Sequence, residues 1–352
     1  MNALLFTLAL SLAGHPAGWY TDDLDAALAA VGPDGVLVVD VGALWCGPCH
    51  QLEREVLDTP AGAALIGPGD AGLAVDFDSE AGHAIAKRLS VISLPTTLVL
   101  DARGAEIGRV EGYVKRDAWL EAVADVRAGR VGLDALAARV EASPDDLDAR
   151  IDLAWARLVQ RDDPKAITAL EEVIAKGGTA GARAGRVLGR WYLRVKDDAV
   201  HAVRHFAALV KRFAGTPHGP GFRYWLALAH HRAGDDAAAL AVFERWRQAD
   251  PSSPAPLALQ ADFMVQSDLP HDAAKRVVLM ALARTPQDAS LHYLLARLFV
   301  GRREIAAAHD AIDRAIALAP DVAIYTNFKR NLPHVPAPAA GVDRRPEAGD
   351  PR

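Results

Sequence analysis

The stretch VLVVDVGALWCGPCHQLEREVL, residues 36–57, decides the fold of the N-terminal part of this chain. Residues 36–41 are rich in β-branched side chains, and the run is short enough to be a buried central strand. Residues 50–57 place apolar side chains at helical spacing. We therefore predict a strand that leads directly through the pentapeptide WCGPC, residues 45–49, into a helix.

Strands and helices alternate on both sides of this stretch. The pattern predicts strands over residues 36–41, 73–78, 96–101 and 106–110, and helices over residues 22–31, 50–57, 84–89 and 117–126. Alternation of this kind is typical of an α/β domain. We assign residues 19–128 to one such domain.

Cys46 and Cys49 are the only cysteines among the 352 residues, so no framework of structural disulfides can form. A Cys-x-x-Cys pair needs further ligands to hold structural zinc. The closest helix-spaced histidines, His201 and His205, lack a partner set, and we expect them to be surface residues. We therefore predict no metal site and no cofactor other than a redox-active Cys46–Cys49 disulfide.

The chemistry of the pair follows from its place at a strand-to-helix junction. A thiolate is the nucleophile in disulfide exchange, and helix N-terminal amides favour its negative charge at Cys46. Cys49 lies nearly one helical turn further on, where it can resolve a mixed disulfide. Gly47 and Pro48 fix the geometry between them, because proline is tolerated in the first helical turn.

The motif at the end of a β-branched strand resembles thioredoxin, and the resemblance covers about 110 residues. It implies that Asp40 is a buried carboxylate that helps to deprotonate Cys49. It also implies that Pro95 is a cis-proline that faces the disulfide and positions the substrate backbone. Gly104 and Gly112 match two late glycines of the family, and Gly112 flattens the surface beside the active site. Trp45 and Leu94 are the remaining neighbours of the predicted active site.

Other interpretations of these residues stay open. The carboxylate of Asp40 could face solvent, Pro95 could be an ordinary loop proline, and Trp45 could serve packing. The sequence also departs from thioredoxin in having glycine at position 42, no lysine in residues 73–77 and no kinking proline in the helix after Cys49. In these departures it is more similar to exported thioredoxin-like domains, including the C-terminal domain of bacterial membrane thiol-disulfide interchange proteins.

Beyond residue 128 the strand signals disappear. Prolines recur at the spacing of tetratricopeptide repeats, at positions 251, 286 and 320. Small residues occur at corresponding positions before these prolines. We predict a helical linker over 129–143 and about five tetratricopeptide-like repeats over 144–326, forming an all-α solenoid after the thioredoxin fold. An irregular helical bundle is the alternative. The remaining residues, 327–352, are predicted to be a disordered tail, because they are rich in Pro, Ala and Gly.

The chain begins with an apolar run, residues 3–13, that ends in the small-x-small pattern of Ser11 and Ala13. We predict a signal peptide and the start of the mature chain within residues 1–18, and a periplasmic or secreted location. The run is too short for a membrane span. The first basic side chain of Lys or Arg type is Arg54, so a cytoplasmic protein is the alternative.

The balance of acidic and basic residues limits the classes of partner that we expect. Lys and Arg total 39 against 45 Asp and Glu, which gives no basic excess for nucleic acid or anionic lipid. The leading hypothesis is a disulfide oxidoreductase that reduces protein substrates, draws on an upstream thiol reductant and binds partners through its repeats. The alternative is a repeat-based scaffold with a non-catalytic or redox-switch domain. Several aromatic residues could belong to an interface or to helix packing: Trp191, Tyr192, Tyr224, Trp225 and Trp246.

Overall fold

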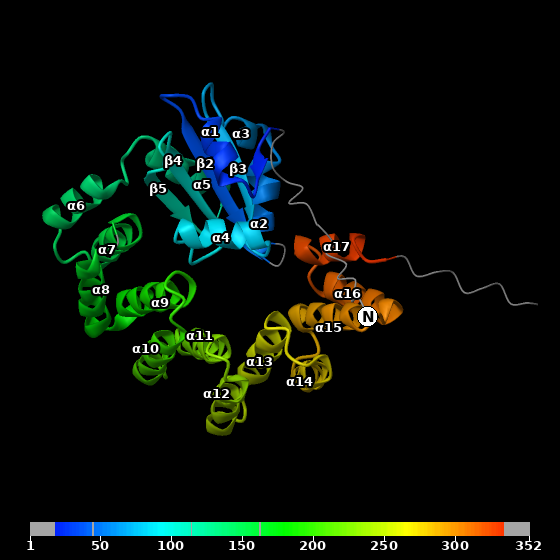
Figure 1. Ribbon diagram of the computed structural model, residues 1–352. Coiled ribbons are helices and arrows are strands. Elements are labelled where there is room, and N and C mark those ends of the chain that lie inside the picture. Colours follow the sequence, from blue (N-terminus) through cyan, green and yellow to red (C-terminus); the bar gives the residue numbers. More distant parts are fainter. Residues whose placement is uncertain (1–17, 44–45, 114, 162, 334–352) are drawn as a thin grey trace, which may run out of the picture.

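The computed structural model describes residues 18–43, 46–113, 115–161 and 163–333 (Figure 1). An α/β domain comes first, and an arc of helices curves away from its β5 edge and returns toward α2. The predicted signal peptide, except for residue 18, lies outside the described residues, as does most of the predicted tail.

A five-stranded sheet forms the centre of the α/β domain, in the order β1-β3-β2-β4-β5. Its strands are β1 (Tyr20–Thr21), β2 (Val36–Gly42), β3 (Ala71–Asp76), β4 (Thr96–Asp101) and β5 (Glu106–Glu111). Strand β2 is parallel to β3 and antiparallel to β4, so it is covered on both edges. The β-branched run fits this position because both faces of a central strand are buried.

Short helices flank the sheet: α1 (Leu24–Ala29), α2 (Gly47–Leu52), α3 (Pro60–Ala63), α4 (Glu80–Arg88) and α5 (Arg116–Arg127). The four predicted strands are confirmed, with bounds that shift by no more than two residues. Strand β1 and helix α3 are too short to leave a periodic signal, and the sequence did not predict them. After α2 the chain continues as a single π-helical segment, η1 (Glu53–Leu57), so the helix changes its winding without a kinking proline.

Helix α6 (Leu133–Ala142) joins the two domains and has no buried residue. Five antiparallel pairs follow, α7 with α8 through α15 with α16, and a single helix, α17, ends the arc. Their bounds are Leu147–Arg161, Pro164–Lys176, Gly178–Arg194, Ala199–Arg212, Gly219–Arg232, Asp236–Ala249, Ala255–Gln266, His271–Arg284, Ala289–Gly301, Ile305–Leu318 and Ala323–Arg330. The solenoid prediction is thus confirmed, but the boundary at 326 was wrong, because α17 continues to Arg330 and Leu332 is buried.

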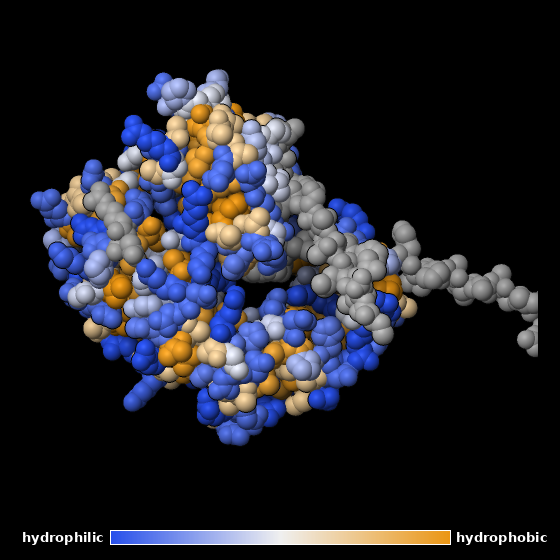
Figure 2. All heavy atoms as spheres, viewed as in Figure 1, coloured by the Kyte–Doolittle hydropathy of each residue, from blue (hydrophilic) through white to orange (hydrophobic). Residues whose placement is uncertain are grey.

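One hydrophobic core runs through most of the repeats, with Phe206, Phe243 and Phe263 fully enclosed. Ile92, from the α/β domain, belongs to the same core, so apolar burial joins the two domains. Trp191, Tyr192 and Trp246 are buried and serve helix packing. At the other end of the arc, α17 contacts α2. Hydrophilic side chains border the hollow between the domains (Figure 2).

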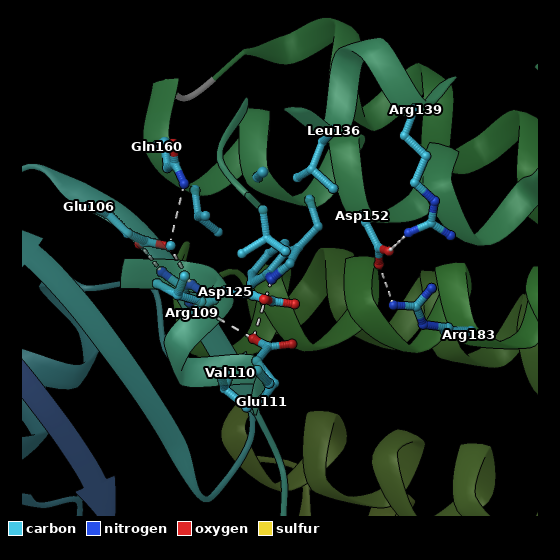
Figure 3. A pocket seen from close by; sticks show the side chains of 17 residues that line it. Glu106, Arg109, Val110, Glu111, Asp125, Leu136, Arg139, Asp152, Gln160 and Arg183 are labelled. Atoms are coloured by element: carbon cyan, nitrogen blue, oxygen red, sulfur yellow. Dashed lines mark hydrogen bonds and ion pairs between the residues drawn. The ribbon is translucent and has the colours of Figure 1, made fainter. Parts of the chain in front are cut away.

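The junction beside β5 is a cavity of about 340 Å³ whose charges pair with one another (Figure 3). Arg109 donates from Nε to Glu106 at 2.8 Å and from its terminal nitrogens to the carbonyls of Leu89 and Ser90. Its guanidinium lies 5.7 Å from the ring centre of Trp155 on α7. On the other wall Arg183 reaches Asp152. Because these charges satisfy each other, we interpret the cavity as a structural junction.

His205 is half-buried, whereas the sequence led us to expect a surface residue. Its Nε2 lies 2.8 Å from the carbonyl oxygen of Gly185, and burial lowers the pKa of its imidazole. Helix α9 carries glycine at positions 185 and 189, which lets α10 approach closely enough for this contact.

The lowered pKa of His205 predicts an acid-sensitive fold. The unfolded chain takes up the proton more readily than the folded chain, so stability should fall as the pH drops below about 6.5, the ordinary histidine pKa. In His205→Gln, urea unfolding should show a smaller loss of stability between neutral and mildly acidic pH. His83→Gln, at an exposed histidine of α4, is the control and should keep the full slope. An unchanged slope in His205→Gln would contradict the assignment.

Candidate active site

Cys46 and Cys49 form a disulfide where the chain passes from β2 into α2, with an S–S distance of 2.03 Å. Cys46 is the N-cap residue of α2, and its Sγ accepts a hydrogen bond from the backbone N–H of Cys49 at 3.2 Å. The same amide would face a thiolate on Cys46 after reduction, and such a donor favours the charged sulfur. The local backbone therefore suits Cys46 as the attacking thiol.

The loop before β4 packs against this disulfide. Leu94 and Phe77 contact the small cluster formed by Ala43 and the two cysteines. The Leu94–Pro95 peptide bond is cis, which is the isomer that the thioredoxin resemblance implies. The carbonyl of Pro95 accepts a hydrogen bond from the N–H of Gly112 at 2.8 Å. Gly112 has φ of +84°, a conformation that favours glycine.

Asp40 is buried within β2, 3% exposed, and does not face solvent. The hydroxyl of Thr97 donates to its carboxylate at 3.1 Å. The register explains this contact, because Thr97 of β4 pairs with Asp40 across one edge of β2 and Ala74 of β3 pairs with it across the other. A threonine hydroxyl thus contacts the carboxylate in a sheet whose β3 carries no lysine.

Sequence reasoning missed several polar residues near α2. His50 is buried and its Nδ1 lies 3.0 Å from Glu53. Tyr113, next to Gly112, donates its hydroxyl to Glu55 of η1. The spacing of His50 and Glu53, three apart on a helix, is the signal that could have revealed the first pair.

The remaining predicted neighbours are placed as follows. Gly47 and Pro48 are exposed at the start of α2, whereas Cys49 is buried behind them. Trp45 lies outside the described residues. The described part of the chain therefore brings Leu94 into contact with Cys46 and Cys49. Pro95 follows Leu94 directly and is hydrogen-bonded to Gly112.

Two searches of the described residues bear on other functions. None of their helices has the length and apolar character needed to cross a bilayer. Within the same ranges, no group of three or more His, Cys, Asp or Glu side chains is arranged to hold a metal ion.

A Cys-x-x-Cys disulfide at a helix start, beside a cis-proline loop on a mixed sheet, defines a domain of the thioredoxin class. A family model described as a thioredoxin-like domain matches residues 23–127, and one described as a tetratricopeptide repeat matches residues 201–254. The chain belongs to the thioredoxin-like family, with tetratricopeptide repeats after the thioredoxin-like domain.

The curated proteins similar to this chain include an interchange protein and a thioredoxin. The thiol:disulfide interchange protein DsbD of Cronobacter sakazakii is 39% identical over 101 residues, 28% of this chain and 17% of that protein. Thioredoxin of Echinococcus granulosus is 36% identical over 90 residues, 26% of this chain and 78% of that protein. The chain thus spans most of the small thioredoxin but only about a sixth of DsbD.

The comparison with solved structures also gives partial matches. The structure of pilF of Pseudomonas aeruginosa is 17% identical, with a TM-score of 0.35, and the match covers 61% of this chain and 96% of that one.

Proposed function

We propose that this protein is a thiol-disulfide oxidoreductase of the cell envelope that reduces disulfides in partner proteins. The observation that carries the proposal is the Cys46–Cys49 pair at the start of α2, where the Cys49 amide donates to the Cys46 sulfur. The relatives named as thioredoxin and as a thiol:disulfide interchange protein support the same chemistry.

The reaction passes two electrons from the dithiol to the substrate. The Cys46 thiolate attacks one sulfur of the substrate disulfide, forms an intermolecular disulfide and releases the first substrate thiolate. The Cys49 thiolate then attacks Cys46, closes the Cys46–Cys49 disulfide and releases the second substrate thiolate. The buried Asp40 of β2 is proposed to accept the Cys49 proton, and a thiol reductant restores the dithiol.

The compartment and the repeats belong to the same proposal. The predicted signal peptide favours the periplasm or the cell exterior, and the similarity to DsbD supports an envelope role. The solenoid would bind the partner, because stacked repeats present an extended inner face to a protein segment.

Trapping of the mixed disulfide tests the proposal. In Cys49→Ala the second attack cannot occur, so substrate proteins should remain attached to Cys46 and should appear as adducts on non-reducing gels. Dithiothreitol should release them for identification by mass spectrometry. The double variant Cys46→Ser, Cys49→Ala is the control and should capture none. Equal adducts from both variants would argue against Cys46 as the attacking thiol.

A further inference from the structure

A groove of about 530 Å³ connects the disulfide region to the inner face of the helical arc. Leu94 and Phe77, which pack against the two cysteines, form its wall on the α/β domain. Helices α9, α11 and α13 form the opposite wall, on the inner side of the arc in Figure 1. A substrate that reaches Cys46 beside the Leu94–Pro95 loop therefore lies next to the repeats.

Arginines of α9 dominate the repeat side of this groove. Arg190 and Arg194 line it, and Arg190 also lines a second cavity of about 340 Å³ together with Arg186. Ser93, just before the cis-peptide loop, lines both cavities. The spacing of four residues places the three arginines on one face of α9. Both cavities that Ser93 lines, next to the Leu94–Pro95 loop, therefore also carry arginine side chains of α9.

The charge of these arginines is only partly compensated, because the carboxylate of Glu111 attracts Arg190. Within the described residues no ion pair joins Arg186, Arg190 or Arg194 to a carboxylate, and the buried Nε of Arg190 has no hydrogen-bond partner. Burial and the neighbouring Arg194 lower the pKa of Arg190 to about 9, and burial lowers that of Arg194 to about 10. Both shifts have the direction expected for cations that are short of anionic partners.

Asp78 and Asp262 line the groove and Glu111 lines the second cavity, and two of these three acidic residues, Glu111 and Asp262, have other hydrogen-bond partners. Glu111 accepts a hydrogen bond from Trp155 and lies 3.9 Å from Arg109. Asp262 accepts one from Gln266, which in turn accepts one from Arg297. Trp225 holds the cations in place, with the guanidinium of Arg190 4.3 Å and that of Arg194 5.1 Å from its ring centre. Three arginines, Arg190, Arg194 and Arg232, and two aspartates, Asp78 and Asp262, line the groove, so its formal charge is positive.

We infer that Arg186, Arg190 and Arg194 select substrates whose cysteine is flanked by aspartate or glutamate, by pairing with those carboxylates while Cys46 attacks the disulfide. This inference rests on the proposed function and adds its substrate class. A carboxylate would supply the hydrogen-bond acceptor that the buried Nε of Arg190 lacks, and arginine pairs well with carboxylates. Arg194 already donates one hydrogen bond, to the carbonyl of Ile92 at 2.9 Å. An extended acidic segment fits because the cations form a row along one helix.

Matched peptides test this with the full chain. Two synthetic peptide disulfides carry either Asp and Glu or Asn and Gln around the cysteine, and a fluorophore released from its quencher reports reduction in dithiothreitol. We expect kcat/KM for the acidic peptide to be about tenfold higher at low salt. Arg190→Gln and the exposed Arg186→Gln should bring the ratio toward one. Arg204→Gln, on the exposed face of α10, is the control and should keep the ratio.

Binding separates this inference from the proposed function. Redox-inert peptides with serine in place of cysteine are titrated by fluorescence anisotropy, and the acidic one should bind more tightly to the unaltered protein than to Arg190→Gln. If neither disulfide peptide is reduced but this preference holds, the oxidoreductase proposal fails, and only the part of the inference that assigns acidic-segment binding to the arginines stands. If both peptides are reduced equally and bind equally, the inference is overturned and the oxidoreductase proposal stands.

Discussion

Replacing Cys46 with serine is expected to lower the rate of insulin disulfide reduction to that of dithiothreitol alone, a loss of at least about 100-fold in the catalysed rate. A serine hydroxyl is not ionised at neutral pH, so the hydrogen bond from the Cys49 amide would have no thiolate to stabilise. Turbidity from precipitating insulin chains measures the rate directly.

The controls for this prediction concern the fold and the division of roles. The thermal unfolding of Cys46→Ser should be compared with that of the reduced unaltered protein, because both lack the Cys46–Cys49 bond. Cys49→Ser should lose turnover as well, but it should still form an adduct with a single equivalent of a disulfide peptide. Activity that persists in Cys46→Ser would favour the scaffold hypothesis over the oxidoreductase proposal.

Replacing Arg109 with methionine is expected to lower the free energy of unfolding by about 3–5 kcal/mol, because it leaves buried partners without their cation. The Arg109 side chain is 8% exposed and that of Glu106 is 11% exposed. The substitution also removes donors from the Leu89 and Ser90 carbonyls and the cation over Trp155, so the two domains lose a shared contact. Urea unfolding followed by circular dichroism measures the change.

The pH dependence sharpens this prediction. Loss of solvation raises the pKa of Glu111, and Arg109 is the main opposing influence. Without Arg109 the pKa of Glu111 rises further, so the folded variant binds a proton at Glu111 more readily than the unfolded chain does. The loss of unfolding free energy in Arg109→Met, relative to the unaltered protein, should therefore be smaller at pH 5 than at pH 8. Arg103→Met, in an exposed turn, is the control and should change little. An equally small effect of Arg109→Met would show that the junction does not depend on this side chain.

The α/β domain could be predicted closely because its signals are local. The β-branched run at 36–41, the turn residues and the WCGPC motif each act over a few residues, and the strands lie within two residues of their expected bounds. The repeat period predicted the helix pairs in the same way. Helix α17 was partly missed because its apolar residues lie next to a Pro-rich segment that suggested a tail.

The polar partners of the site could not be predicted, because they depend on pairing across strands and domains. Nothing in the sequence places Thr97 beside Asp40 until the register of β2 and β4 is known. The row of arginines on α9 is visible at helical spacing, but its proximity to Leu94 arises only when the arc folds back beneath the first domain. Long-range geometry of this kind leaves no mark in a single sequence.

The contact between α17 and α2 has a mechanical consequence for the whole molecule. A repeat array attached at one end is a spring that can bend and twist along its length, whereas this one is clamped at both ends to the same body. Clamping removes the softest bending motions, so less conformational entropy remains to be lost when a segment enters the groove. The far clamp is the helix that begins at the cysteines, so the last helix of the array touches the element that carries the candidate active site.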